Sequence, residues 1–212
     1  MVAVTLYVEG GGDAKSLRTA CRQGFSTFLT KAGVMTAELR IVACGGRASA
    51  YKDFRKAIAA GNPAMLLVDS EEPVSQAYQQ GEPEGWLPWQ HLAQRVGDRW
   101  QKPDDARELH CHLMVQCMES WLVADRDTLE RFFGPSFKGN QLPDANVPIE
   151  SVIKTKLYDG LKSATQSRKI RAPYGKGRHS FRILAQINPE KVQAASPWAR
   201  RFVDEMKRRM GS

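Results

Sequence analysis

Short apolar runs alternate along the first 133 residues with segments whose apolar positions recur at helical spacing. Apolar runs rich in β-branched residues predict strands, and a spacing of three and four residues predicts amphipathic helices. The strands are expected at residues 2–8, 39–44, 64–68 and 113–117. The helices are expected after an N-cap at Asp13 and over residues 48–60, 86–100, 118–133, 149–161, 181–187 and 197–210. Strands that alternate with helices imply βαβ crossovers, so the predicted fold is α/β and Rossmann-like, with a mainly parallel four-stranded sheet flanked by helices.

The distribution of charge changes along the chain. The 212 residues carry a net charge of +8. Residues 1–153 contain 16 Lys and Arg against 19 Asp and Glu, whereas residues 154–212 contain 15 against 4. We therefore expect an α/β domain over residues 1–133 and a basic helical extension over residues 134–212 packed on it. A concentrated positive charge suggests a polyanionic partner, nucleic acid first, and the alternative is a solvated basic surface.

Composition excludes several classes of protein. Hydrophobic residues make up 42% of the chain and charged residues 25%, which are ordinary values for a globular protein. No apolar run approaches the roughly 20 residues that a membrane helix needs. The N-terminal segment lacks the basic region and cleavage site of a signal peptide, so a cytoplasmic location is expected. The four cysteines show no CxxC spacing and are expected to be reduced, buried packing residues.

Carboxylates stand at the ends of three predicted strands. Glu9 follows the first strand, Asp69 and Glu71 follow the third, and the fourth runs into Glu119. Ligands of parallel α/β sheets bind beyond the carboxyl ends of the strands. Several carboxylates close together are unfavourable unless a cation neutralises them, and their oxygens favour Mg²⁺ or Mn²⁺. A metal site is therefore expected here, and the alternative is that these residues are helix caps or exposed turn residues.

The glycine turn at residues 10–12 does not match either of the two well-known phosphate-binding loops. The GxxxxGK[ST] pattern fails because Ala14 precedes Lys15, and the dinucleotide pattern fails because Lys15 occupies the last glycine position. Close approach to a phosphate and a simple tight turn both remain open for this segment.

Glu9-Gly10 after the first strand and Asp69-Ser70-Glu71 after the third resemble the Toprim domain of topoisomerases, DnaG-type primases and OLD-type nucleases. In that domain a glutamate and a later Asp-x-Asp together hold Mg²⁺. Glu71 departs from the pattern, because it lengthens the side chain of the second aspartate by one methylene. With the segments 118–125 (MESWLVAD) and 174–179 (YGKGRH), the chain is similar to the compact Toprim-like family of bacterial anti-phage defence loci.

The resemblance implies a Toprim-like fold and a Mg²⁺-dependent nuclease, with RNA such as tRNA as the substrate before DNA. It further implies control by a partner AAA/ABC-type ATPase, and homodimers occur in such families. Topoisomerase chemistry is not implied, because it needs a nucleophilic tyrosine in a separate domain. Two alternatives stay open: a non-catalytic Toprim-like subunit that binds a partner ATPase or nucleic acid, and a phosphotransfer enzyme that shares the Mg²⁺ site.

The nuclease hypothesis assigns roles to named residues. Glu9, Asp69 and Glu71 hold Mg²⁺ or Mn²⁺, and Glu9 is alternatively a general acid or base. Glu119 is a fourth ligand, a group that supports the ligands, or a carboxylate that interacts with a helix dipole. Lys176 stabilises charge on the phosphoryl group and His179 protonates the leaving group, or their loop only contacts backbone phosphates. The predicted nucleic-acid contacts are Lys176, Arg178, Arg182, Arg200 and Arg201.

Two further expectations concern helices. Trp86, Trp89 and Trp100 are predicted on one face of a single helix, where a core or partner-interface role is favoured over stacking on bases. Asp125 is expected to cap the turn that follows it.

Overall fold

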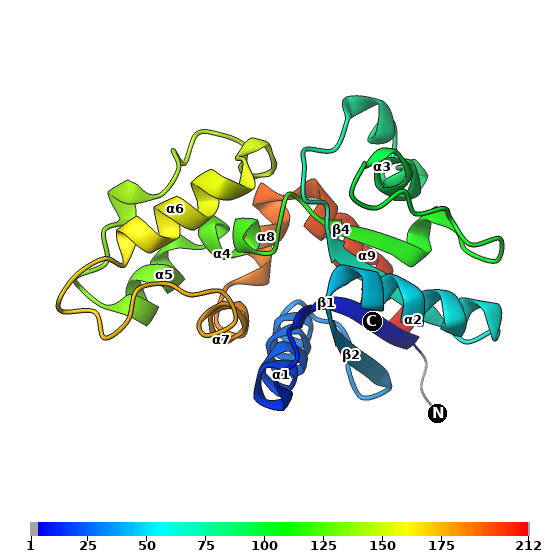
Figure 1. Cartoon of the computed structure of the whole chain (residues 1–212), viewed down its shortest axis with the longest axis horizontal. Helices are drawn as coiled ribbons and strands as arrows, with labels where there is room; N and C mark the ends of the chain where they lie inside the picture. The colour runs from blue at the N-terminus through cyan, green and yellow to red at the C-terminus, as the bar shows by residue number, and fades with distance from the viewer. Residues whose placement is uncertain (1–3, 212) are drawn as a thin grey trace.

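A single four-stranded sheet lies at the centre of the protein, in a computed structural model that describes residues 4–211 (Figure 1). The strands are β1 (Val4–Gly11), β2 (Leu39–Gly45), β3 (Ala64–Asp69) and β4 (Cys111–Met114), in the order β2-β1-β3-β4. Every neighbouring pair runs parallel. The predicted fold class is therefore confirmed: a Rossmann-like α/β protein with a four-stranded parallel sheet flanked by helices. Residues 2 and 3 of the first predicted strand lie outside the described residues.

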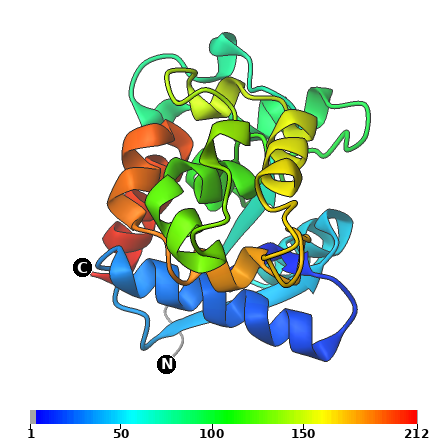
Figure 2. The ribbon, with the colours of Figure 1, turned by 90° about the vertical axis from the view of Figure 1, so that its left-hand side faces the viewer.

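Helices cover both faces of this sheet. They are α1 (Lys15–Lys31), α2 (Arg47–Ala59), α3 (Pro88–Gln94), α4 (Glu119–Ala124), α5 (Arg126–Phe133), α6 (Lys154–Ala164), α7 (Ser180–Leu184), α8 (Pro189–Ala195) and α9 (Pro197–Met210). Figure 2 shows α4 to α7, in green, yellow and orange, grouped on one side of the molecule in front of the sheet. No helix among residues 4–211 combines the length and the apolar character needed to cross a membrane.

Two hydrophobic clusters pack on the two faces of the sheet. Leu6, Met65 and Leu67 belong to a cluster with α1 and the later helices, whereas Leu66 and Val68 belong to a cluster with α2 and α3. Successive side chains of a strand point to opposite faces, so a strand covered on both faces is apolar throughout. This explains why β3 is a continuous apolar run.

The helices after residue 133 share the core of the sheet. Phe202 and Met206 of α9 belong to the same cluster as Leu6 of β1 and Phe28 of α1. Helix α9 also packs against β4, the edge strand of the sheet. The predicted terminal helix is confirmed. The division of the chain into an α/β domain and an extension packed on it stays a prediction. The boundary at residue 133 stays a prediction, and the apolar core continues across it.

The predicted helix over residues 86–100 is wrong. Helix α3 covers only Pro88–Gln94, and the chain on either side of it is irregular. Trp86 and Trp100 lie outside the helix, yet both are buried with Trp89 in the cluster on the α2 face. Burial in the core confirms the favoured role of these side chains, although they do not share a helix.

The two predicted helix caps have opposite outcomes. The prediction for Asp13 is wrong, because Ala14 occupies the N-cap of α1. The side chain of Asp13 is exposed, and its Oδ1 lies 3.7 Å from Arg18 Nη2. The prediction for Asp125 is confirmed, because its side chain accepts a hydrogen bond from the Thr128 N–H at the start of α5. Asp125 also divides the predicted helix over residues 118–133 into α4 and α5. The four cysteines are free and buried, as expected.

Gly24 of α1 is predicted not to tolerate a side chain. A Cβ atom at this position would lie 2.7 Å from the backbone oxygen of Phe181, so α1 or α7 would have to move. Alanine favours a helix over glycine, yet we expect Gly24→Ala to lower the free energy of unfolding by about 1–3 kcal/mol because of this clash. Urea unfolding measures the difference. Gly85→Ala, where a Cβ meets no atom within 4 Å, should stay within about 0.5 kcal/mol of the wild type. Equal stability of the two variants would contradict the tight α1–α7 contact.

Candidate metal centre

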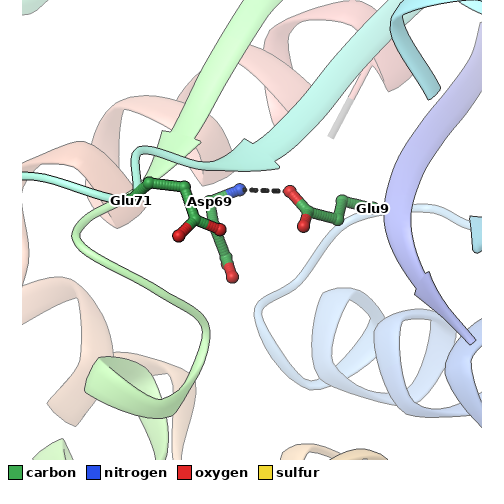
Figure 3. A group of neighbouring side chains, drawn as sticks. All are labelled: Glu9, Asp69 and Glu71. Carbon is green, nitrogen blue, oxygen red and sulfur yellow. Dashed lines mark hydrogen bonds between the residues drawn. The ribbon is translucent and has the colours of Figure 1, made fainter. Parts of the chain in front are cut away.

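Three carboxylates meet at the carboxyl edge of the sheet, as the sequence predicts (Figure 3). Glu9 lies in β1, Asp69 is the last residue of β3, and Glu71 follows two residues later. One oxygen of each carboxylate lies within 4.8 Å of the others. Strands β1 and β3 pair in parallel, so their carboxyl ends lie side by side. The cluster of Glu9, Asp69 and Glu71, called the acidic cluster below, can hold a metal ion.

Backbone hydrogen bonds fix the position of Asp69. Its N–H donates to Glu9 Oε2 at 3.1 Å, and its Oδ1 accepts from the Met118 N–H at 2.9 Å. The second oxygen, Oδ2, lies 3.8 Å from both Lys154 Nζ and Lys176 Nζ. One oxygen of this buried carboxylate therefore holds the chain after β4, and the other faces the cations of the site.

Glu71 joins the acidic cluster through an unusual backbone conformation. Its φ of 66° is in the left-handed region, which few residues other than glycine adopt and which is often found at functional sites. The backbone N–H of Glu71 donates to the backbone oxygen of Gln116 at 2.8 Å, and this bond connects the turn to the segment after β4. The longer side chain of Glu71, compared with an aspartate, does not keep it out of the cluster.

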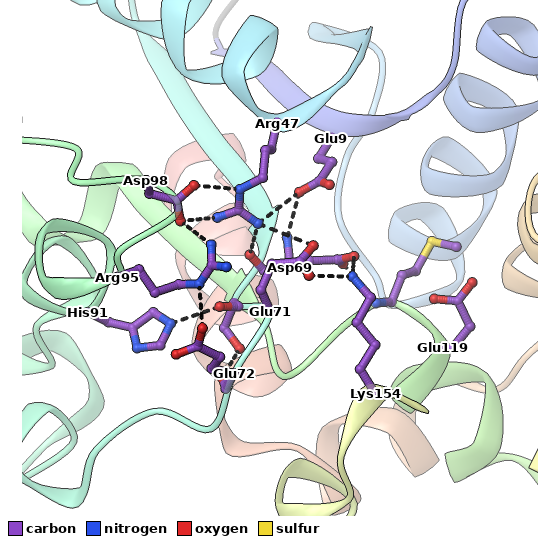
Figure 4. A network of polar contacts seen from close by, with 12 residues as sticks. Glu9, Arg47, Asp69, Glu71, Glu72, His91, Arg95, Asp98, Glu119 and Lys154 are labelled. Carbon is purple, nitrogen blue, oxygen red and sulfur yellow. Dashed lines mark hydrogen bonds and ion pairs between the residues drawn. The ribbon is translucent and has the colours of Figure 1, made fainter. Parts of the chain in front are cut away.

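Arg47, which sequence analysis missed, lies among the three carboxylates (Figure 4). Its Nη1 is 3.5 Å from Glu9 Oε2 and 3.5 Å from Glu71 Oε1, and it donates to the Asp69 backbone oxygen at 2.9 Å. Asp98 holds the other edge of the guanidinium through hydrogen bonds of 2.8 and 2.6 Å. Arg47 begins α2 just after β2, so the rule that located the carboxylates could have found it as well.

Two lysines from the C-terminal part of the chain also reach the acidic cluster. Lys154, the first residue of α6, donates to Glu71 Oε2 at 2.6 Å. Lys176, which the sequence predicts at this site, approaches Asp69 from the loop before α7. Lys154 had no signal in the sequence, because helix packing alone brings α6 to the edge of the sheet.

Burial and charge shift the pKa values of the acidic cluster. Burial, with a further contribution from the charge of Glu9, raises the pKa of Asp69 to about 8. Burial also raises the pKa of Glu9, against the opposing charge of Arg47. Burial favours a raised pKa for Glu71 too, but the hydrogen bond and charge of Lys154, with Arg47, outweigh it and lower the pKa. The Glu9–Asp69 pair therefore binds a proton readily, unless a metal ion takes the place of that proton.

Glu119 lies fully buried beside the acidic cluster and is held by two tyrosines. Its Oε1 accepts a hydrogen bond of 2.8 Å from the Tyr174 hydroxyl, and its Oε2 accepts one of 2.9 Å from the Tyr158 hydroxyl. Burial and the charge of Glu119 raise the pKa of both phenols, so both remain donors. Since both oxygens have partners, the structure does not place Glu119 as a fourth ligand. Its position at the start of α4 agrees with the helix-dipole alternative.

The structure does not bring His179 to the carboxylates. Its Nδ1 accepts a hydrogen bond from the Gly175 N–H at 3.1 Å, and its buried ring packs against Phe132, Phe133 and Tyr174. The predicted role of His179 in protonating the leaving group is therefore corrected. His179 instead lines a separate cavity with two predicted nucleic-acid contacts, Arg178 and Arg182.

The prediction that Arg201 contacts nucleic acid is wrong. Its guanidinium is buried and donates to the backbone oxygens of Pro83, Glu108 and Cys111 at 2.7, 3.0 and 2.9 Å. Arg200 is exposed on the other side of α9, and its contact with nucleic acid stays a prediction.

A cavity of about 290 Å³ opens beside the acidic cluster. It is lined by Glu9, Asp69 and Lys176 together with the glycines at residues 10–12. Gly10 has a φ of 138°, and a Cβ there would lie 3.1 Å from the ring of Phe181. Its positive φ and its close packing against Phe181 therefore favour glycine at residue 10, and the glycine turn borders the same cavity as the carboxylates.

Fold and site together define a parallel α/β protein with a charged cluster, able to hold a metal ion, at the carboxyl edge of its sheet. The chain belongs to the family described as "Domain of unknown function (DUF4276)", whose model matches residues 8–207. That match includes all the residues of the acidic cluster and the cations around it. No curated protein and no solved structure matches the chain.

Proposed function

We propose that this protein is a metal-dependent nuclease with a Toprim-like fold. The observation that carries the proposal is the convergence of Glu9, Asp69 and Glu71 at the carboxyl edge of the sheet, with their oxygens within 4.8 Å of one another. Three carboxylate oxygens are hard ligands of the kind that Mg²⁺ or Mn²⁺ binds together with substrate phosphates and water. The donor set therefore fits Mg²⁺, and Glu9, Asp69 and Glu71 would hold it.

The residues around the ion have separate tasks in a nuclease. A bound Mg²⁺ would supply a Lewis acid that polarises a phosphoryl oxygen and acidifies a water molecule. Lys176 is exposed on its loop and binds the substrate phosphate from the side of Asp69. Arg47 orients Glu9 and the end of β3, and the two tyrosines keep the charge of Glu119 in place behind the site.

The substrate and context of this nuclease come from the resemblance of its motifs and from its charge. We propose that it acts in the cytoplasm as an effector of bacterial anti-phage defence, under the control of a partner AAA/ABC-type ATPase, and cleaves RNA such as tRNA before DNA. The excess of 15 Lys and Arg over 4 Asp and Glu in residues 154–212 supports a polyanionic substrate.

One observation favours a non-catalytic subunit as the second candidate. Lys154 and Arg47 approach both oxygens of Glu71, at 2.6 and 3.5 Å, so protein cations already neutralise this carboxylate. A protein that bound a partner ATPase or nucleic acid with this fold would not need a metal there.

A cleavage assay separates the two candidates. The purified protein is expected to cleave total tRNA with Mg²⁺ or Mn²⁺ and not with EDTA, and plasmid DNA assayed in parallel reports the class of substrate. Because Glu9→Ala/Asp69→Ala removes two ligands, cleavage should fall by about 100-fold or more. Glu72→Ala, which removes an exposed neighbouring carboxylate outside the acidic cluster, serves as the matched control and should retain activity.

Two outcomes of this assay would contradict the proposed nuclease. Cleavage that persists in the double variant or in EDTA would assign the activity to another site or to a contaminant. No cleavage, together with no Mg²⁺ binding by calorimetry, would instead support the non-catalytic subunit.

A further inference from the structure

A second cavity, with a volume of about 820 Å³, shares a loop with the acidic cluster. Lys176 and Gly177 of this loop line the cavity of the carboxylates, whereas Arg178 and His179 line the second cavity. The rest of its lining comes from the end of α5, residues 169–172, α7 and Gln186, which follows α7. A molecule bound in the second cavity therefore lies next to the loop that carries Lys176.

Cations dominate the lining of this second cavity, called the basic cavity below. Five exposed side chains contribute positive charge: Arg131, Lys169, Arg171, Arg178 and Arg182. No carboxylate lines the basic cavity, and within residues 4–211 no ion pair joins any of these five cations to a carboxylate. The cations around the acidic cluster, in contrast, are paired with carboxylates. Unneutralised charge in a concave surface attracts a polyanion.

The effect of this charge is visible at His179. Burial lowers the pKa of its imidazole, and the charges of Arg178 and Arg182 lower it further. A neutral imidazole leaves the positive potential of the cavity to its arginines and its lysine.

Aromatic rings lie among the cations. Phe132 and Phe133 are half-buried in the lining, and the Arg182 guanidinium lies 5.3 Å from the ring centre of Phe132. Cations beside exposed parts of aromatic rings are the combination with which proteins bind single-stranded nucleic acid, because phosphates pair with the cations and unstacked bases stack on the rings. A base inside a duplex is already stacked and cannot reach rings within a cavity.

We propose that the basic cavity binds the backbone of a single-stranded nucleic acid, with an unpaired base on Phe132 or Phe133. Bound there, the strand extends along the shared loop toward Lys176 and the acidic cluster. The inference rests on the proposed function for the identity of the polymer, and it specifies the form in which that polymer is recognised.

Binding without metal tests this proposal. The probe is a fluorescein-labelled single-stranded RNA of 12 nucleotides, followed by fluorescence anisotropy in EDTA at several salt concentrations. The affinity of the variant Arg171→Ala/Arg178→Ala/Arg182→Ala is expected to be at least about tenfold lower. The slope of its log affinity against log salt concentration should be shallower by about 2. Since all three side chains are exposed, the unfolding temperature should stay near that of the wild type.

The matched control removes the same charge elsewhere. Lys52→Ala/Arg55→Ala/Lys56→Ala takes three exposed cations from α2, which line a different cavity. This variant should bind the RNA within about twofold of the wild type, because net charge alone has only a small effect at moderate salt. Equal weakening of both triple variants, or none in the first, would overturn the proposal. A blunt-ended duplex that binds as tightly as the single strand would overturn it too.

The failure of this proposal is distinguishable from failure of the nuclease. The anisotropy assay needs neither metal nor cleavage, so RNA binding that depends on the basic cavity upholds the inference even in a protein that cleaves nothing. Metal-dependent cleavage, together with RNA binding that is unchanged in the first triple variant, upholds the nuclease. The same result overturns the proposal that the basic cavity binds single-stranded nucleic acid.

Discussion

Asp69→Asn is expected to remove Mg²⁺ binding and cleavage together, and to leave the metal-free protein at least as stable as the wild type near pH 7. The substitution exchanges a charged ligand for a neutral amide, so cleavage should fall by about 100-fold or more. The amide oxygen can still accept the hydrogen bond that Asp69 receives from the Met118 N–H. Calorimetric titration with Mg²⁺ and the tRNA assay measure the two losses.

The expected stability of metal-free Asp69→Asn follows from the pKa of Asp69 in the wild type. Folding raises it to about 8 from an ordinary value of about 3.9. The folded protein therefore holds this proton more tightly than the unfolded chain, and the stability so gained is complete below about pH 4 and is lost as the pH rises toward 8. In EDTA, the unfolding temperature of the wild type should fall relative to that of Asp69→Asn between pH 5 and pH 8.

Mg²⁺ supplies the control for this pH dependence. It binds the ionised cluster, so it should raise the unfolding temperature of the wild type most at pH 8 and have little effect on Asp69→Asn. Parallel pH profiles for the two proteins in EDTA would contradict the raised pKa. An equal response of both proteins to Mg²⁺ would contradict Asp69 as a ligand.

Arg201→Met is expected to cause the largest loss of stability among the substitutions considered. The buried guanidinium donates to the backbone oxygens of Pro83, Glu108 and Cys111, and it also lies 3.0 Å from the His112 ring. Methionine keeps the apolar stem but removes every hydrogen bond of this buried charged donor, although the oxygens of Pro83 and Glu108 each keep one backbone donor. The free energy of unfolding should fall by roughly 3–5 kcal/mol, measured with urea.

The neighbouring arginine is the matched control for this loss. Arg200→Met removes the same charge from the exposed side of α9 and should change stability by less than about 0.5 kcal/mol. Similar stabilities of the two variants would show that the acceptors around Arg201 find other partners.

Local pattern was sufficient to predict the first three strands and the acidic cluster, whereas the fourth strand, β4 (Cys111–Met114), begins and ends earlier than the predicted residues 113–117. An apolar run such as β3 can be recognised from its own residues, and parallel pairing then places Glu9 and Asp69 side by side. The burial of Arg201 could also have been predicted, because Arg201 follows Trp198 by three residues and therefore lies on the apolar face of its helix. Its charge led to the wrong prediction of a surface contact, although its spacing indicated burial.

Other parts of the site depend on packing between distant segments. Lys154, Tyr158 and Tyr174 reach the carboxylates only because α6 and the loop before α7 pack against α4. The aromatic spacing of residues 86–100 indicated one helix, but Trp86 and Trp100 are buried from irregular segments on either side of α3. No periodicity within a short window contains that information.

The contribution of α9 to the core of the sheet has a consequence for synthesis of the chain. The ribosome makes β1 long before α9, yet Leu6 of β1 and Phe202 of α9 belong to one hydrophobic cluster. The face of the sheet that α9 completes is therefore open to water while most of the chain emerges. During translation, this protein exposes an apolar surface of the kind that chaperones bind and that aggregates when they are scarce.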